Sequence, residues 1–265
     1  MKIFISADIE GTTGIAHWNE TEKGLKDYEY FQEQMTREVK AACKGALKGG
    51  ATEIIVKDAH DSARNINPRE LPKEVKINRG WAKHPFSMVY GIDESFDAVM
   101  FIGYHSPAYG EGNPLAHTMN GNIVEIRLNG VRTSEFLMHS MAAQSVGVPS
   151  IFISGDKKLM EHAKAINPNI KTLAVSEGIG NSSTSIHPDL AVEEIEKIVE
   201  GALKGDLNKY KIEMPETFVF EVEFVHHYNA YRGSFYPGAE KIDEKTVRYT
   251  SNNYFDIMRA AMFLL

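Results

Sequence analysis

The amino-acid sequence predicts an α/β protein with a mainly parallel sheet, helices on both faces and a smaller α+β part near the C-terminus. Short runs such as residues 3–5 and 54–56 are apolar at every position, which is typical of strands covered on both sides. Longer segments of helical periodicity lie between these runs, as in βαβ units. Apolar and acidic residues alternate over Phe218–Phe224, which indicates an antiparallel strand with one solvated face.

The first half of the chain contains the segments expected at the centre of the sheet. A strand through residues 3–5 runs into Asp8, and a helix over Tyr28–Lys48 is expected to end at Gly49 and Gly50. Apolar residues recur in this helix at helical spacing, which predicts one buried face. The further strands expected here are residues 54–56, a weak strand at Val75–Asn78, and residues 96–103.

The middle of the chain contains a strong hairpin signal. Asn129 and Gly130 separate Ile123–Leu128 from residues 131–133, as in a two-residue β-turn. Ser134 is expected to cap a helix over Glu135–Ser145. The elements expected after it are a buried strand at 150–154, a helix to about residue 165, a short strand at 172–175, a helix over Pro188–Leu203, a strand at 247–250 and a helix at 252–265.

A charged segment at residues 204–215, interrupted by Gly205 and Pro215, is the expected domain boundary. We expect residues 1–210 to form an α/β metal-binding catalytic domain and residues 211–265 to form a smaller α+β region. The hairpin and helix at residues 121–146 are expected to pack with this smaller region.

Composition and charge narrow the class of protein. The chain has 265 residues, 43% of them hydrophobic and 25% charged, which is ordinary for a globular protein. Its net charge of -7 argues against nucleic acid as a partner, because phosphate binding requires a basic surface. Cys43 is the only cysteine, so disulfides within the chain and cysteine-based metal sites are excluded. Asp8 lies too early for the apolar core of a signal peptide and no apolar run could span a membrane, so a cytoplasmic location is expected.

Acidic residues follow the first strand directly. Because side chains alternate along an extended chain, Asp8 and Glu10 leave on the same face at the carboxyl end of the strand, where open α/β sheets bind ligands. Two carboxylates this close repel one another when buried, unless a cation lies between them. The pair therefore predicts a cation site, whose other ligands are expected at neighbouring strand ends.

Imidazole groups follow the next two apolar strands. His60 and His105 lie at these strand ends, and His117 and Glu135 come later in the chain. Oxygen and nitrogen ligands without sulfur suit zinc, manganese or iron(II) better than calcium or magnesium. The set is too large for one tetrahedral zinc, so two metal ions are expected, with Asp8 as the shared ligand and a bridging hydroxide that attacks a carbonyl group.

Each of these residues also has an ordinary structural interpretation. A histidine after a strand is more often a hydrogen-bonded structural residue than a ligand. Glu135 alone is a favourable charge at a helix N-terminus, and His117 alone is a loop histidine. The arrival of several ligand types at one edge of the sheet is what favours a metal site.

Several short motifs occur in an order that resembles the zinc-dependent D-aminopeptidase family. They are Ser6-Ala7-Asp8-Ile9-Glu10-Gly11, Asp58-Ala59-His60, Pro85-Phe86-Ser87-Met88-Val89, Gly103-Tyr104-His105, His117-Thr118-Met119 and Glu135. The resemblance runs through most of the chain and is weakest after about Pro215. One departure is that the family's Ser-His-Ser-Met is Ala116-His117-Thr118-Met119 here, which keeps the hydroxyl after the histidine and loses the one before it.

The resemblance implies a specific site and activity. It implies two zinc ions per subunit, with His117 as the catalytic histidine; the implied ligands are Asp8, Glu10, His60, His105 and Glu135. It also implies a hydrolase that removes the amino-terminal residue, a D-amino acid, from short peptides or amino-acid amides. A homo-oligomer is implied as well, a decamer of two rings that encloses its active sites.

The role of His117 and the substrate leave alternatives open. The family describes this histidine as a nucleophile, but a metal centre already supplies one. We therefore expect His117 to donate a hydrogen bond to the developing oxyanion or a proton to the leaving amine. The alternative functions are an L-aminopeptidase or amidase on the same site, a non-catalytic peptide-binding protein, and a metallophosphatase, for which no glycine-rich phosphate loop is present.

Overall fold

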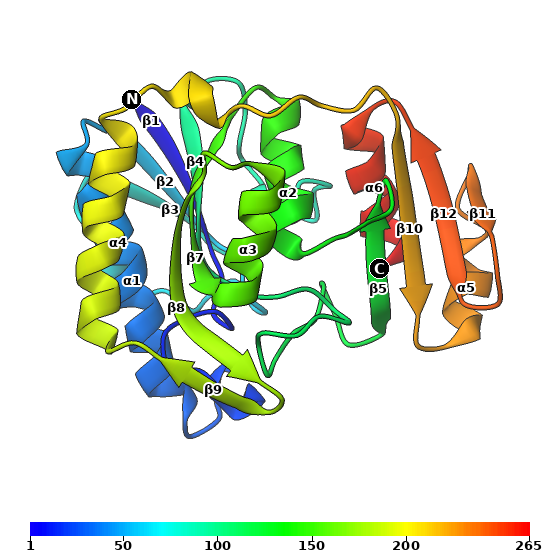
Figure 1. Ribbon diagram of the computed structural model, residues 1–265, viewed down its shortest axis with the longest axis horizontal. Helices are drawn as coiled ribbons and strands as arrows, with labels where there is room; N and C mark the ends of the chain where they lie inside the picture. The colour runs from blue at the N-terminus through cyan, green and yellow to red at the C-terminus, as the bar shows by residue number, and fades with distance from the viewer.

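The computed structural model describes residues 1–265 and contains two sheets (Figure 1). The larger sheet has seven strands in the order β3-β2-β1-β4-β7-β8-β9. These strands are β1 (Lys2–Ala7), β2 (Glu53–Asp58), β3 (Val75–Asn78), β4 (Ala98–Tyr104), β7 (Ser150–Asp156), β8 (Lys171–Ile179) and β9 (Ser182–Ser185). Neighbouring strands are parallel, except for β8 and β9, which form an antiparallel hairpin at one edge.

Helices cover both faces of the larger sheet. α1 (Tyr28–Lys48) and α4 (Pro188–Leu203) pack together on one face, and α2 (Glu135–Ser145) and α3 (Lys157–Ile166) lie on the other (Figure 1). Met35 and Val39 of α1 are fully buried, as the helical spacing predicts. The central strand β4 is buried at every position, because helices cover it on both sides.

The smaller sheet has five strands in the order β11-β12-β10-β5-β6. They are β5 (Ile123–Leu128), β6 (Val131–Arg132), β10 (Phe218–Phe224), β11 (Ala239–Lys241) and β12 (Thr246–Ser251); α5 (His227–Gly233) and α6 (Tyr254–Leu264) accompany them. α6 contacts both β10 and α2, so it joins this sheet to the helices of the larger one (Figure 1). Antiparallel pairing of β5 with β10 brings the hairpin at residues 123–132 into this sheet. The division near residue 210 remains a prediction.

The strand order of the larger sheet changes direction between β1 and β4. The chain runs from β1 outward to β2 and β3, and then crosses to β4 on the other side of β1. In open α/β sheets, the crevice at the carboxyl ends of the strands at such a switch point is where ligands bind. Asp8 follows β1 and His105 follows β4, so both residues lie at this crevice.

Two glycines let neighbouring segments approach the end of β4. A β-carbon at Gly11 would lie 1.8 Å from the Tyr104 carbonyl oxygen, and a β-carbon at Gly155 would lie 1.8 Å from the same atom. Any other residue at either position would require the backbone to move. The loop after Glu10 and the end of β7 are therefore packed closely against the strand that leads to His105.

The structure confirms the α/β class and the predicted bounds of α1, α2 and α4. Asn129 and Gly130 have φ values of 50° and 78°, as a type I′ turn requires. The strand predicted at residues 172–175 is longer and turns back into β9, a polar segment without the apolar alternation that indicates a strand. The seven-residue helix α5 was also not predicted, because it is too short to show a helical period.

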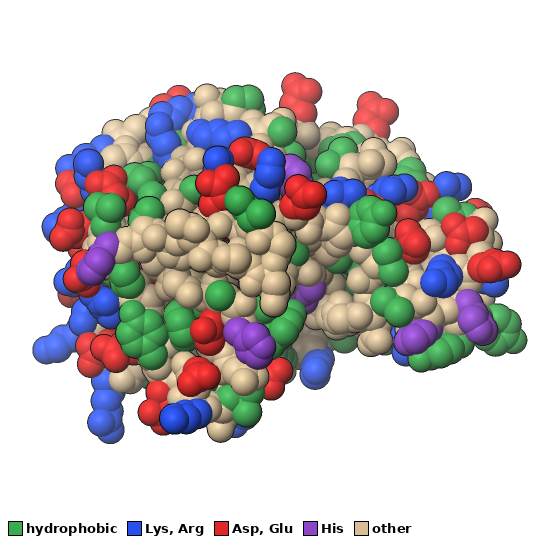
Figure 2. Space-filling model, turned by 60° about the horizontal axis from the view of Figure 1, so that its bottom comes forward, with side chains coloured by type: hydrophobic (Ala, Val, Ile, Leu, Met, Phe, Trp, Pro, Cys, Tyr) green, Lys and Arg blue, Asp and Glu red, His purple; other side chains and the backbone are tan.

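The surface of the molecule carries charges of both signs. On the face shown in Figure 2, the side chains of Lys and Arg are interspersed with those of Asp and Glu. None of the helices has the length and apolar character that crossing a bilayer requires.

Candidate metal centre

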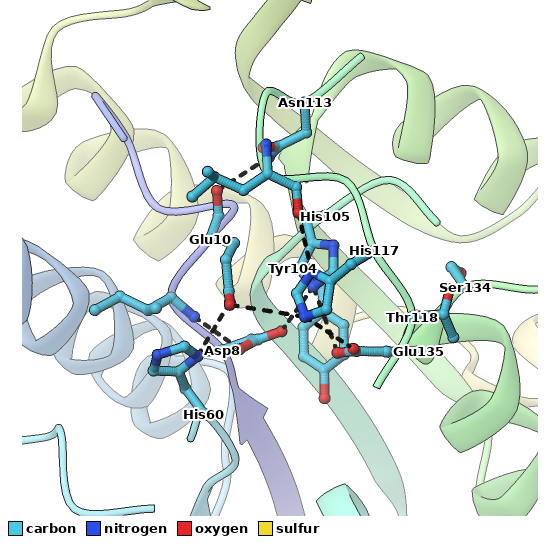
Figure 3. Close-up of polar contacts among 12 residues, drawn as sticks. Asp8, Glu10, His60, Tyr104, His105, Asn113, His117, Thr118, Ser134 and Glu135 are labelled. Carbon is cyan, nitrogen blue, oxygen red and sulfur yellow. Dashed lines mark hydrogen bonds and ion pairs between the residues drawn. The ribbon is translucent and has the colours of Figure 1, made fainter. Parts of the chain in front are cut away.

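The predicted residues that follow strands lie at one edge of the larger sheet. Asp8 and Glu10 follow β1, His60 lies two residues after β2, and His105 is the first residue after β4. Because these three strands are adjacent and parallel, their carboxyl ends meet at the same edge. The four side chains consequently approach one another (Figure 3).

Two further predicted residues come from the chain after β4. Glu135 is the first residue of α2, and the hydroxyl of Ser134 caps this helix by accepting a hydrogen bond from the Leu137 backbone N–H. His117 lies in the loop between β4 and β5. Both side chains point toward the strand ends, so the structure brings all six predicted residues together (Figure 3).

The carboxylates and imidazoles form two adjacent groups. His60 Nδ1 lies 3.4 Å from Asp8 Oδ1 and 3.1 Å from Glu10 Oε2. His105 Nε2 lies 3.5 Å from Asp8 Oδ2 and 3.5 Å from Glu135 Oε2. Asp8 thus directs one oxygen into each group, which is the arrangement that a ligand shared by two metal ions would adopt.

The spacing and hydrogen bonding of these atoms fit bound metal ions. Ligand atoms placed about 2.0–2.1 Å from a tetrahedral zinc ion lie roughly 3.3 Å apart, close to the distances of 3.1–3.5 Å between the histidine nitrogens and the carboxylate oxygens. Three of the buried atoms, Asp8 Oδ2, Glu10 Oε2 and His105 Nε2, have no hydrogen-bond partner. Since buried polar atoms are nearly always paired, a cation would account for all three.

Backbone carbonyls orient the two buried histidine rings. His60 Nε2 lies 2.9 Å from the Thr21 carbonyl oxygen, and His105 Nδ1 lies 2.9 Å from the Ser106 carbonyl oxygen. In each case the ring N–H donates to the carbonyl, so the lone pair of the other ring nitrogen faces the carboxylates. Both rings are therefore held in the tautomer that a metal ligand requires.

The carboxylates and imidazoles of this cluster shift one another's pKa values. Burial and the charge of Glu10 raise the pKa of Asp8 from 3.8 to about 6. Burial lowers the pKa of His60 and His105, but the nearby carboxylates outweigh it and raise both pKa values well above 6.5. Burial would raise the pKa of Glu135, yet the charge of His105 lowers that pKa to about 2. The metal-free cluster therefore binds protons where cations fit.

His117 lies on the exposed side of this cluster. Its ring stacks on His105 with centroids 4.4 Å apart and planes at 6°, and the edge of Trp18 lies against it at 5.2 Å. His117 Nδ1 donates to the Leu115 carbonyl oxygen at 2.9 Å, so Nε2 is the nitrogen that faces the carboxylates. The distances from this nitrogen are 3.9 Å to Glu10 Oε1 and 3.6 Å to Glu135 Oε1.

Hydrogen bonds hold the loop that carries His117. The Thr118 hydroxyl accepts from the Ala108 N–H and donates to the Thr133 carbonyl oxygen, at 3.0 and 3.2 Å. The Met119 N–H donates to Glu135 Oε1 at 2.6 Å, and Met119 has a positive φ of 66°. The hydroxyl after the histidine thus orders the loop, while the bond to Glu135 holds a backbone conformation that is unfavourable for methionine.

The cluster opens into a cavity of about 490 Å³. Five of the six predicted residues line this cavity; the other side chains that line it include Trp18, Thr21, Lys23, Trp81, Met88 and Met119. Acidic and imidazole groups at one end and aromatic and methionine side chains on the walls suit a small organic molecule with a cationic or polar end.

The D-aminopeptidase family of peptidases has a family model that matches residues 1–263. The chain belongs to the D-aminopeptidase family. Among individual relatives, a D-aminopeptidase of Bacillus subtilis (strain 168) is 27% identical over 266 residues, which cover 100% of this chain and 96% of the relative. A solved structure, described as the Zn-dependent D-aminopeptidase DppA from Bacillus subtilis, a self-compartmentalizing protease, has a TM-score of 0.92 and 26% identity, and the match covers 100% of this chain and 96% of that one.

These comparisons confirm the predicted family, the α/β fold and the assignment to an enzyme class of peptidases. The sequence patterns did not predict Trp18, Trp81 or Met119 as site residues, although all three line the cavity of this D-aminopeptidase family member. Trp18 and Trp81 are the only tryptophans in the chain, and both occur in polar connections outside the expected strands and helices. An aromatic side chain in a polar loop near predicted ligands is the one signal that could have selected them.

The raised pKa of Asp8 predicts how the metal-free protein responds to pH. The folded state holds this proton more tightly than the unfolded chain does, so stability should fall as the pH rises from about 4 to about 6. Asp8→Asn removes this loss. In the presence of a chelator, the variant should exceed the parent in free energy of unfolding by about 3 kcal/mol near pH 7.5 and by little near pH 4.

Urea unfolding with EDTA at the two pH values measures this difference. Asp27→Asn is a suitable control, because the Asp27 side chain makes no capping hydrogen bond at α1. Excess zinc should reverse the order of the two proteins. Equal stabilities of parent and Asp8→Asn near pH 7.5 would contradict the proposed repulsion.

Proposed function

We propose that the protein is a zinc-dependent aminopeptidase that hydrolyses the bond after the amino-terminal residue, a D-amino acid, in short peptides or amino-acid amides. The observation that carries the proposal is the convergence of three carboxylates and two imidazoles, three of whose buried atoms lack hydrogen-bond partners. The relatives named D-aminopeptidase, one of them described as Zn-dependent, support the metal and the substrate class.

The proposed centre holds two zinc ions. Asp8, Glu10 and His60 would hold one ion, and Asp8, His105 and Glu135 would hold the other. Zinc at this position supplies a Lewis acid for the carbonyl group and lowers the pKa of water, so that hydroxide forms near neutral pH. The hydrogen bonds of His60 and His105 to backbone carbonyls fix the ring orientations, so the other nitrogen of each ring faces the zinc position once its proton has left.

The protein's own side chains select and orient the substrate. Two zinc ions would neutralise the three buried carboxylates, so discrimination among substrates falls to the other side chains that line the cavity. His117 borders the cavity with Nε2, while its other nitrogen is fixed on the Leu115 carbonyl oxygen. Because Nδ1–H is held on that carbonyl, Nε2 is the basic nitrogen of the neutral ring. Once it has taken up a proton, Nε2 is placed to donate a hydrogen bond to the developing oxyanion or that proton to the leaving amine. Trp18 and His105 both pack against the His117 ring.

Removal and return of metal tests the proposed function. Purified protein should lose hydrolysis of D-Ala p-nitroanilide after chelation and regain it with zinc, with two zinc ions bound per chain by metal analysis. L-Ala p-nitroanilide should be cleaved at least about tenfold less efficiently, since a chiral pocket with a misplaced substrate loses transition-state contacts. Equal rates on both substrates would favour the L-aminopeptidase or amidase alternative. Binding of peptides without cleavage at any metal content would favour the peptide-binding alternative.

His117→Ala separates catalysis from metal binding. We expect kcat/KM to fall by about 100-fold or more, because a general acid or oxyanion donor is lost. Zinc content should equal that of the parent. His187→Ala provides the control, since His187 is exposed and lies at the start of α4. Loss of zinc from His117→Ala would show that this residue is a ligand and that its proposed role is wrong.

We also propose that the chain forms a homo-oligomer, specifically the two-ring decamer implied by its family. One relative is described as self-compartmentalizing, which supports assembly of many copies. Four aromatic residues on α5, α6 and the segment after α5 are 57–69% exposed, and we refer to them together as the aromatic surface: Tyr228, Tyr231, Phe235 and Phe263. Exposed apolar surfaces of this kind commonly mark protein–protein interfaces.

Substitutions in the aromatic surface test the assembly. Sedimentation of the parent should give ten times the 29.6 kDa mass of one chain. The double variant Phe235→Ser and Phe263→Ser should sediment as a smaller species, because each subunit would lose two aromatic rings that become buried at the proposed interface. Tyr30→Ser changes a similarly exposed ring on α1 and should leave the mass unchanged. A decamer in the double variant would exclude this surface as an essential contact.

A further inference from the structure

A second cavity, of about 310 Å³, lies beside the one that contains the metal cluster. It is mainly apolar, and its walls include Met119, Met138, Met258, Met262, Leu265 and Trp81. These residues come from the connection between β3 and β4, the loop after β4, α2, and α6 with the residue that follows it. The cavity therefore lies between α2 of the larger sheet and the C-terminal helix of the smaller one. Methionine side chains are flexible and adapt to apolar groups of different shapes.

The two cavities share part of their walls. Trp81 and Met119 line both of them. The Met119 N–H donates to Glu135 Oε1 at 2.6 Å, and the Trp81 Nε1–H donates to the Asp61 carbonyl oxygen at 2.6 Å. Lys57 Nζ also lies 4.4 Å from the Trp81 ring centroid. The shared wall is thus attached to a residue of the metal cluster, and the two cavities adjoin at Trp81 and Met119.

A buried histidine in the second cavity also lacks a partner. His139 is one turn after Glu135 on α2, and its Nδ1 donates to the Glu135 carbonyl oxygen at 2.7 Å. His139 lines the cavity, is 0% exposed, and its Nε2 has no hydrogen-bond partner. An unpaired buried nitrogen costs about 1–3 kcal/mol. His139 Nε2 is a polar atom of the wall that an apolar occupant leaves unpaired, so the position and apolar lining of the cavity, and not this atom, indicate what it binds.

We propose that this second cavity is the subsite for the side chain of the substrate's amino-terminal residue and that it accepts large apolar side chains. The proposal rests on the proposed aminopeptidase function. In such a substrate, the amino group and the scissile carbonyl are both attached to the α-carbon. Both must reach the acidic cluster, so the side chain on the same carbon has to enter a space that adjoins it. The cavity behind Met119 and Trp81 meets this requirement.

The remainder of the substrate has a different path. The first cavity extends past Thr21, Glu22 and Lys23, which are polar. A peptide beyond the scissile bond carries polar backbone groups and a terminal carboxylate, which this side of the first cavity suits better than the methionine-lined space does. The two cavities therefore divide the substrate at the α-carbon of its first residue.

Two variants that change the second cavity in opposite directions test the subsite. Ala82 lines the cavity and is exposed, so Ala82→Trp can narrow it without disturbing the core. Met262 also lines it and is 41% exposed, so Met262→Ala can widen it. Ala165→Trp, at an exposed position of α3 outside both cavities, is the matched control and should behave as the parent does.

Three substrates are compared. D-alaninamide has no large apolar group, D-phenylalaninamide carries one in its side chain, and D-Ala p-nitroanilide carries one in its leaving group. Ala82→Trp should lower kcat/KM for D-phenylalaninamide about tenfold more than for D-alaninamide, and Met262→Ala should shift the same ratio the other way. A selective loss on D-Ala p-nitroanilide would place the leaving group in this cavity and overturn the proposal. An unchanged ratio in both variants would also overturn it.

A binding measurement separates this proposal from the proposed function. Calorimetry of the zinc-loaded protein with D-phenylalaninol and D-alaninol needs no turnover. The parent should bind D-phenylalaninol about tenfold more tightly, and Ala82→Trp should abolish that preference while Ala165→Trp keeps it. Absence of the preference in the parent overturns the subsite, whereas absence of hydrolysis with the preference intact counts against the proposed function alone.

Discussion

The structure depends on holding three carboxylates close together in a buried place. Asp8, Glu10 and Glu135 are each less than 5% exposed, and they share two imidazole neighbours. Their mutual repulsion and desolvation would favour an open or protonated arrangement if the surrounding chain were flexible. The parallel strands, the helix N-terminus of α2 and the backbone carbonyls that hold the histidine rings resist that opening. Cations that bind between the carboxylates would relieve this repulsion, which favours their binding.

The support for the cluster comes mainly from the end of β4. The Tyr104 carbonyl oxygen is packed between Gly11 and Gly155, so the chain segments on both sides of β4 cannot move apart independently. Asp156 accepts hydrogen bonds from the Ser106 N–H and hydroxyl, both at 2.6 Å. Ser106 in turn holds the His105 ring through its carbonyl. The position of the His105 ring is thus fixed by contacts that join β4 to β7.

Sequence patterns predicted the parts of the fold and site that depend on local chemistry. Continuous apolar runs predicted the central strands, the Ser134 cap predicted the start of α2, and the positions of Asp8, His60 and His105 after strands predicted one crevice. Neither strand order nor cavity shape has a local signature. Trp81 and Met119 reach the site through long connections whose path is set by tertiary packing, and His139 is an ordinary helical residue until α6 closes over it. The role of Glu135 could be inferred only from its place in an ordered set of motifs.

The proposed ligands are distributed widely along the chain. Asp8 and Glu10 follow the first strand, whereas Glu135 starts a helix just beyond the midpoint of the chain. β7 must also be added before β4 becomes an interior strand. During synthesis on a ribosome, a nascent chain that ends before residue 135 has only part of the donor set. Firm capture of zinc by the proposed ligands would therefore follow, and not precede, assembly of the larger sheet. A nascent chain of this enzyme that has bound its metal would therefore already have assembled the larger sheet.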